Sequence, residues 1–195
     1  MMLKQTLLAV AIVLSPITAF AGGSLDVFYV DQNISAGGPD DDGNGVGFRG
    51  QAALGQGVSL TALYQDAELK DADANLRETR IGLSYDTKCH NINVGAGLET
   101  VGVDLNDGGL GASLRGHSLN AHASISPIDK VSLTARIGYT DVDELAGMEY
   151  EVGAQYAIDK QISAFVEYRM ANLNDEGFGA DVDLDTLRVG GRYTF

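Results

Sequence analysis

Apolar and polar residues alternate at a period of two along most of the chain after residue 22. No stretch in this region shows the 3.6-residue period of an amphipathic helix, and alternation at a period of two is typical of β-strands. The alternation predicts ten strands, near residues 24–34, 45–54, 58–66, 76–86, 91–101, 116–125, 131–141, 148–157, 162–170 and 185–195. The sequence therefore indicates a single all-β domain over residues 22–195.

The connections between the predicted strands alternate in length. The short connections are expected near 55–57, 86–90, 126–130 and 158–161, and the longer, acidic ones near 35–44, 67–75, 102–115, 142–147 and 171–184. This pattern is typical of an up-and-down antiparallel sheet with one short-turned end and one looped end. We predict an up-and-down antiparallel transmembrane β-barrel of ten strands, or of eight if one hairpin is wrongly assigned.

One face of the predicted strands is aliphatic and contains all eight tyrosines of the chain. Tyr85, Tyr156 and Tyr193 fall near the short-turned end, and the other five tyrosines fall toward the looped end. Two bands of amphipathic rings around an aliphatic belt are typical of a barrel that crosses a membrane. The alternative is a soluble periplasmic barrel with this face inside, which would not explain why the tyrosines lie near strand ends.

The opposite face combines glycines with arginines and glutamates, and every lysine after residue 22 falls instead in a predicted turn or loop. Arginine suits confined ion pairs because its guanidinium is planar and weakly hydrated. Phe28, Leu63, Val101 and Phe165 are apolar exceptions on this face. We expect a lumen ion-pair network made by Arg49, Glu78, Arg80, Glu99, Arg136, Glu149, Glu151, Glu167, Arg169, Arg188 and Arg192.

The first 21 residues predict a secretory signal peptide. They contain one lysine, an apolar run and the small-x-small sequence Ala19-Phe20-Ala21. The run is too short for a comfortable transmembrane helix and is interrupted by Pro16. The alternative is an uncleaved membrane anchor.

The last strand alternates apolar or aromatic residues from Leu187 to the final Phe195. In this ending the sequence resembles the small single-chain outer-membrane β-barrels of Gram-negative bacteria, and more faintly the diffusible-signal-regulated small barrels. The resemblance implies a location in the cell outer membrane after secretion to the periplasm, in contact with lipid and lipopolysaccharide. It also implies that the barrel-assembly machinery recognises Tyr193 and Phe195 as an assembly signal.

The charge and cysteine content exclude two classes of protein. The chain has 13 basic and 27 acidic residues and a formal net charge of −14. Nucleic acid is therefore not an expected partner, since its phosphates need a basic surface. A disulfide framework is excluded because Cys89 is the single cysteine.

The acidic segments raise the question of divalent cations. Asp40, Asp42 and Asn44, followed by Gly45, match the opening spacing of a calcium-binding loop. The match fails at the twelfth position, which is Gln51 instead of glutamate. These three residues are weak candidates for binding Ca²⁺ or Mg²⁺ and bridging to lipopolysaccharide, and the favoured interpretation is a solvated acidic loop. We expect no cofactor.

Catalytic motifs are poorly represented. His122 and Ser124 share one face of a predicted strand, as in barrel lipid deacylases, but no glutamate follows within the next dozen residues. Cys89 and His90 are adjacent in a turn and lack a third partner. We therefore predict no catalytic residues and a non-enzymatic outer-membrane protein.

The number of strands sets an expectation for the lumen. Barrels of about eight strands have interiors filled by side chains, whereas porins of sixteen or more leave a wide channel. Ten strands predict a narrow lumen filled by paired Arg and Glu, beneath acidic surface loops. The alternatives are a narrow pore for small solutes and a lipid-modifying enzyme, while solute, receptor and oligomeric state stay open.

Overall fold

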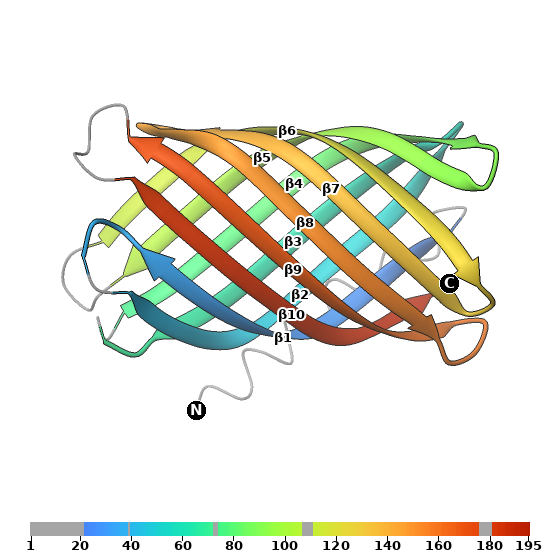
Figure 1. The fold of residues 1–195 in the computed structure, drawn as a ribbon, viewed down its shortest axis with the longest axis horizontal. Coiled ribbons are helices and arrows are strands. Elements are labelled where there is room, and N and C mark those ends of the chain that lie inside the picture. The colour runs from blue at the N-terminus through green and yellow to red at the C-terminus, as the bar shows by residue number, and fades with distance from the viewer. Residues whose placement is uncertain (1–21, 39, 72–73, 107–110, 176–180) are drawn as a thin grey trace.

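The computed structural model describes residues 22–38, 40–71, 74–106, 111–175 and 181–195, and these form a closed antiparallel barrel (Figure 1). The predicted signal peptide at 1–21 lies outside the described residues. No described segment is a helix long and apolar enough to span a bilayer. The strands are β1 (Gly23–Ser35), β2 (Asp41–Gly55), β3 (Val58–Leu69), β4 (Ala74–Cys89), β5 (Ile92–Asn106), β6 (Gly111–Ile128), β7 (Val131–Val142), β8 (Leu145–Ala157), β9 (Ile162–Asp175) and β10 (Val182–Thr194).

The barrel closes because β1 pairs with both β2 and β10. The β1–β10 register runs from Ser24 opposite Thr194 to Ser35 opposite Asp183. Gly23 and Phe195 extend this pairing by two further backbone hydrogen bonds, of 3.1 and 3.0 Å. Since a closed sheet has no edge, its backbone polar groups pair between strands. The ten-stranded up-and-down prediction is confirmed.

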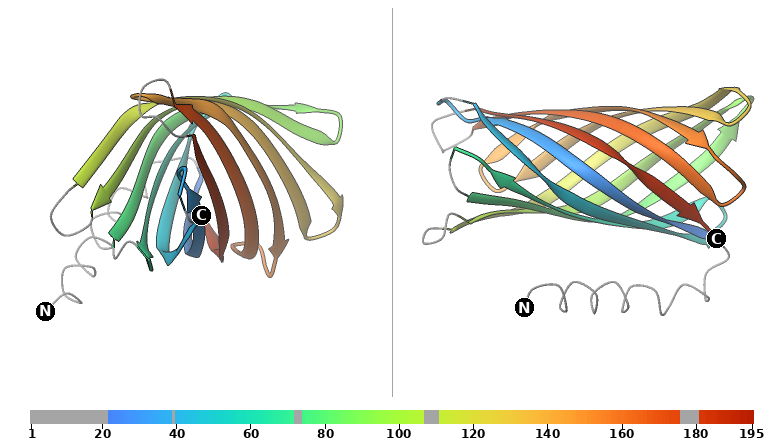
Figure 2. Two further views of the ribbon diagram at one scale, coloured as in Figure 1. Left: turned by 60° about the vertical axis from the view of Figure 1, so that its left-hand side comes forward. Right: turned by 90° about the horizontal axis from the view of Figure 1, so that it is seen from below.

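The two ends of the barrel differ in their connections. We call the end with the hairpins at residues 56–57, 90–91, 129–130 and 158–161 the turn end, and the opposite end the loop end. Both Gly23 and Phe195 lie at the turn end, as the position of the C-terminus in Figures 1 and 2 shows. Figure 2 also shows that the strands run obliquely around the barrel.

Two turn-end hairpins are tighter than the sequence predicted. The turn expected at 86–90 contains only His90 and Asn91, because β4 continues to Cys89 and includes Lys88. The turn expected at 126–130 likewise begins only after Ile128. Positive φ angles reverse the chain within two residues, 57° at His90 and 67° at Lys130.

At the loop end the strands are longer than predicted, so several expected loops are wrong. The segment 102–115 is mostly strand, with β5 and β6 paired as far as Asn106 and Gly111. The connection expected at 142–147 contains only Asp143, with a φ of 50°, and Glu144. The acidic residues here suggested loops, but they alternate with apolar residues that point into the barrel.

The loop-end parts of the strands form what we call the collar. Its residues are 30–35, 41–45, 66–69, 74–77, 101–106, 111–117, 140–142, 145–148, 171–174 and 182–186. In the collar the inward side chains are mostly apolar and buried, and the outward ones are mostly polar. The collar therefore has the polarity of a water-soluble barrel.

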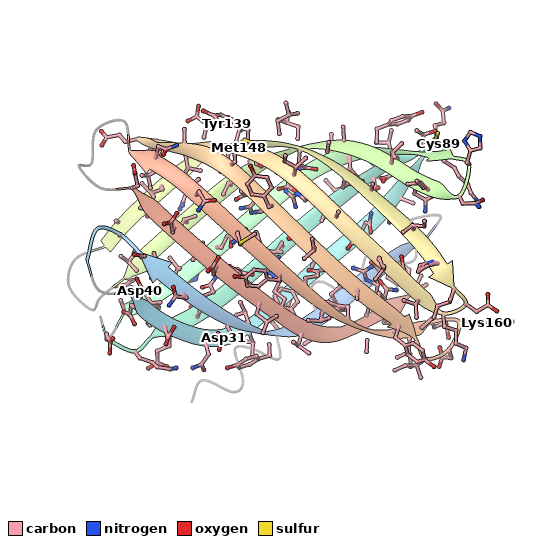
Figure 3. The ribbon with its side chains drawn as sticks, viewed as in Figure 1. Asp31, Asp40, Cys89, Tyr139, Met148 and Lys160 are labelled. Carbon is pink, nitrogen blue, oxygen red and sulfur yellow. The ribbon has the colours of Figure 1, made fainter. Side chains whose placement is uncertain are left out.

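Below the collar, toward the turn end, the polarity is reversed. The outer surface there is a belt of exposed Val, Leu, Ile and Tyr side chains, including all eight tyrosines. Tyr139 lies on this outer surface near the collar, as Figure 3 shows. We call this part the belt. Its exposed apolar surface and its inward polar side chains are typical of a wall that faces lipid, as the sequence predicted.

Candidate functional site in the barrel lumen

The centre of the lumen contains a layer of buried ion pairs. Arg80 binds Glu149 through two nitrogens, at 2.8 and 2.5 Å, and its Nε donates to Glu78 at 2.6 Å. Arg169 donates to both carboxylate oxygens of Glu78 at 2.6 and 2.7 Å. Because these residues come from β4, β8 and β9, the layer joins opposite walls of the barrel.

A second group of ion pairs lies closer to the turn end. Asp26 is fully buried and binds Arg49 at 2.7 Å and Arg192 at 2.7 and 2.8 Å. Arg49 also holds Glu167 at 2.6 and 3.0 Å. Asp26 was absent from the predicted network. Its position between the outward-facing Leu25 and Val27 was the signal that places it on the inner face.

The remaining arginines complete the network. Arg188 donates to Gln65 at 2.9 Å and to Glu151 at 3.1 Å. Arg136 donates to Glu99 at 2.6 Å. All eleven residues expected in the network lie on the inner face, and each makes at least one ion pair. Gln65, which links Arg188 to Glu78, was also absent from the predicted network, although its place between the outward Tyr64 and Asp66 puts it on the inner face.

The apolar exceptions on the inner face pack within this network. Phe28 and Phe165 meet edge to face with ring centroids 6.2 Å apart, and Leu63 belongs to the same buried cluster. The guanidinium of Arg49 lies 5.4 Å from the Phe165 ring, and that of Arg188 lies 5.8 Å from the Phe28 ring. The two rings therefore provide cation–π contacts to arginines withdrawn from water.

Between the ion-pair layer and the loop end, apolar side chains close the lumen. Val101, the fourth exception, belongs to this apolar cap, where Val101 and Val142 are 3% and 1% exposed. The cap consists of Ile34, Leu69, Ala74, Leu76, Val101, Val103, Leu105, Leu114, Val142, Leu145, Leu173, Val182 and Leu184. The lumen wall at this level is therefore mainly apolar.

The turn-end half of the lumen is instead hollow and polar; we call it the vestibule. It contains cavities of about 180 and 250 Å³, and both are lined by Arg49, Asp86, His122 and Arg136. His122 Nε2 lies 2.7 Å from Asp86 Oδ1. Gly95 makes this contact possible, since a Cβ there would lie 2.4 Å from the imidazole. Asp86 was also missed, because its segment was assigned to a turn.

The residues considered for catalysis have other partners or lack a third member in the structure. His122 and Ser124 both face the vestibule, but His122 pairs with Asp86, while Asn93 Nδ2 lies 3.4 Å from Ser124 Oγ. Cys89 lies at the turn end (Figure 3), exposed, with its Sγ 3.7 Å from His90 Nδ1. His122 and Ser124 therefore face the interior of the barrel and not the lipid surface.

The cation candidates do not form a calcium loop. Asp42 and Asn44 lie within β2, where Asp42 accepts a hydrogen bond from Asn33 at 2.9 Å and Asn44 pairs with Asp31. Asp40 precedes the strand at the loop end (Figure 3). Within the described residues no group of three or more His, Cys, Asp or Glu side chains could hold a metal ion.

The predicted assembly signal lies at the seam between the first and last strands. The rings of Tyr193 and Phe195 are 6.3 Å apart, and Gln161 donates to the Tyr193 hydroxyl at 3.2 Å. The Phe195 ring covers Gly23, where a Cβ would lie 2.9 Å from it. The C-terminal residue thus takes part in barrel closure.

The comparisons with known proteins identify the fold. No family model and no curated sequence matches the chain. Among solved structures it is similar to the outer membrane protease OmpT of Escherichia coli (10% identity, 90% of this chain and 97% of that one, TM-score 0.61). It is also similar to Neisserial surface protein A (13%, 89% and 97%, 0.54) and to the β-domain of the Bordetella autotransporter BrkA (14%, 89% and 99%, 0.53).

Proposed function

We infer from its fold that the chain is a small outer-membrane β-barrel of the Gram-negative type, with buried Arg/Glu salt bridges inside. We propose that it is a non-enzymatic integral outer-membrane protein whose lumen is closed to solutes. The observation that supports this function is the pair of barriers in series: the central ion-pair layer and the apolar cap.

The two barriers oppose solute passage in different ways. Gln65 is fully buried, and Glu78, Arg169 and Arg188 are nearly so, so a solute would have to separate charged partners that have no water to replace them. Beyond them an ion would meet aliphatic walls and lose its hydration without compensation. Each barrier alone would oppose ion flow.

The orientation and partners follow from the same proposal. An even number of strands places both chain ends and the short turns on the periplasmic side, so the collar and its acidic outer surface face the cell exterior. The belt contacts membrane lipid, and the collar lies beside lipopolysaccharide headgroups, with divalent cations between them. The barrel-assembly machinery would recognise the strand ending at Tyr193 and Phe195.

The absence of an enzymatic role is part of the proposal. His122 and Ser124 lie inside the vestibule, whereas a lipid-modifying enzyme must present its reactive groups to the acyl or ester groups of a lipid in the bilayer. Changing either residue to Ala should leave the lipid composition of the membrane unchanged. Loss of a lipid modification in these variants would establish the enzymatic alternative.

A planar-bilayer recording tests the closed lumen. Mature protein folded into vesicles should be fused with the bilayer after unboiled gel electrophoresis has shown the heat-modifiable, folded band. We expect no stable conductance steps after verified insertion. Reproducible, salt-dependent steps would contradict the proposal and establish the second candidate, a narrow pore. The hollow, polar vestibule is the observation that favours this candidate.

A further inference from the structure

The wall of the inner vestibule cavity has more cations than anions. All six lumen arginines line this cavity of about 180 Å³, against the three carboxylates of Asp86, Glu99 and Glu151. The other lumen carboxylates do not line it, but Asp26, Glu78, Glu149 and Glu167 pair with these arginines and neutralise most of their charge. An anion in this space would therefore depend on an arginine whose donors are not all used by such pairs.

One of these arginines is only partly used by the protein. Arg49, Arg80 and Arg192 bond through all three of their guanidinium nitrogens. By contrast, Arg136 makes a single hydrogen bond among the described residues, from Nη2 to Glu99 at 2.6 Å; its Nε also has no partner but is buried away from the cavity. The Nη1 group is therefore the donor that Arg136 retains beside the cavity.

A buried amide lies next to Arg136. Asn120 on β6 faces Gly138 on β7, two residues from Arg136 on the same inner face, so Asn120 and Arg136 are diagonal neighbours. The Asn120 side chain is 6% exposed and lines the cavity, and its amide makes no hydrogen bond with a described residue and keeps some access to the cavity. Its amide rests over Gly97, where a Cβ would lie 3.1 Å from Oδ1. A buried amide without partners is costly unless something in the cavity satisfies it.

We propose that the vestibule binds a small oxoanion, a carboxylate or a phosphate, between Arg136 and Asn120. Guanidinium and amide N–H groups together match the two acceptor oxygens of such an anion. The cavity, of about 180 Å³, has room for an ion of that size. The anion enters from the turn end, because the apolar cap closes the other side.

This site is independent of whether the barrel conducts. Anion binding is measured on folded protein in detergent micelles, without a membrane potential. Failure to bind an anion would therefore leave the closed-lumen proposal intact, and a conducting barrel would leave the anion-site proposal intact. The three histidines of the chain provide the signals: His122 lines the cavity, whereas His90 and His117 are exposed outside it.

The experiment is an NMR titration of histidine ring signals at fixed pH, with sodium succinate or sodium phosphate replacing sodium chloride at constant ionic strength. We expect a saturable shift of His122 with at least one of the two anions, and no saturable shift of His90 or His117. Saturation by succinate alone identifies a carboxylate site, and saturation by phosphate alone identifies a phosphate site. A linear shift of all three rings, or none, would overturn the proposal.

Two variants and one control locate the site. Arg136→Lys keeps the pair with Glu99 but loses the planar donor group, and Asn120→Leu removes the amide without leaving an unpaired charge. Each should weaken binding roughly tenfold, the effect of losing one hydrogen bond to a charged group. Arg115→Lys, on the exposed collar surface, should change nothing. Unchanged affinity in both folded cavity variants would overturn the assignment.

Discussion

The belt and the collar use the same alternation with opposite chemistry, and β1 contains both. In the belt, Val27 and Tyr29 point outward and are about half exposed, while Asp26 points inward and is fully buried. In the collar, Asp31 points outward and Val30 inward. The difference teaches that the medium around the barrel, lipid or water, decides which face is apolar.

The two regions are consequently stabilised by different interactions. In the collar, burial of aliphatic side chains from water supplies the hydrophobic effect. In the belt, apolar side chains face lipid on folding, and the interior is joined by ion pairs that span the lumen, such as Arg80 with Glu149. The same kind of substitution should therefore lower the free energy of unfolding much more in one region than in the other.

The largest effect is expected from breaking the central ion-pair layer. Glu78→Gln removes the charge shared by Arg80 and Arg169, and unpaired buried charges typically cost about 3–5 kcal/mol. Urea unfolding in lipid vesicles, followed by circular dichroism, measures the free energy of unfolding. The matched control is Glu68→Gln, at an exposed outward position of the collar, and an equal loss in both variants would contradict the prediction.

A somewhat smaller effect is expected from a cavity in the apolar cap. Leu76→Ala truncates a side chain that is 4% exposed within the collar, and comparable core truncations cost about 2–5 kcal/mol. Leu83→Ala on the same strand faces lipid, whose acyl chains can fill the vacated space, and should cost clearly less. Urea unfolding in lipid vesicles measures both variants. A greater loss of unfolding free energy in Leu83→Ala than in Leu76→Ala would contradict the division between cap and belt.

A third pair of variants compares the outer surfaces directly. Val27→Arg places a charge on the lipid-facing belt of β1, which costs up to about 2–4 kcal/mol depending on depth. Asp31→Arg, four residues along the same strand in the collar, should cost at most about 1 kcal/mol, as near a membrane interface. Equal destabilisation would place the lipid boundary elsewhere on β1.

The smallest effect is expected outside both regions, in the turn at residues 158–161. Asp159 accepts backbone hydrogen bonds from Gln161 at 2.7 Å and Ile162 at 2.8 Å, and these donors hold the pKa of its carboxyl below the usual value. A lowered folded-state pKa stabilises the fold above the unfolded-state pKa, and the stabilisation disappears as the pH falls through the folded-state value. Asp159→Ala should therefore lower the urea midpoint slightly at pH 7.

Repeating the comparison of the parent and Asp159→Ala in acid provides the control. At a pH below both pKa values, the parent and Asp159→Ala should unfold at nearly the same urea concentration, because the carboxyl is then protonated in the folded and unfolded states alike. A midpoint difference that persists unchanged in acid would show that the turn is stabilised by something other than the ionised carboxylate.

The sequence predicted the number of strands and which alternate side chains of each strand face the lumen, because a period of two is a local property. It could not predict which charges pair, since Arg80 and Glu149 are 69 residues apart and meet across the lumen. It also misassigned the collar, where acidic residues such as Asp104 were interpreted as loop. The alternation there continues with inverted polarity, and Val103 and Leu105 on either side of Asp104 are the signal that was available.

The boundary between belt and collar also fixes how deeply the protein sits in a bilayer. Tyr29, Tyr64 and Tyr139 are each followed two positions later by an outward aspartate. Sinking the barrel by two residues, about 7 Å along a strand, would move these carboxylates from the interface into the edge of the hydrocarbon, at a cost that rises with depth. Raising it by the same amount would lift the rings out of the interface. The tyrosine-to-aspartate step on these three strands therefore sets the depth of the barrel in the bilayer. A membrane of unsuitable thickness would have to deform around the barrel to keep both residues in their preferred surroundings.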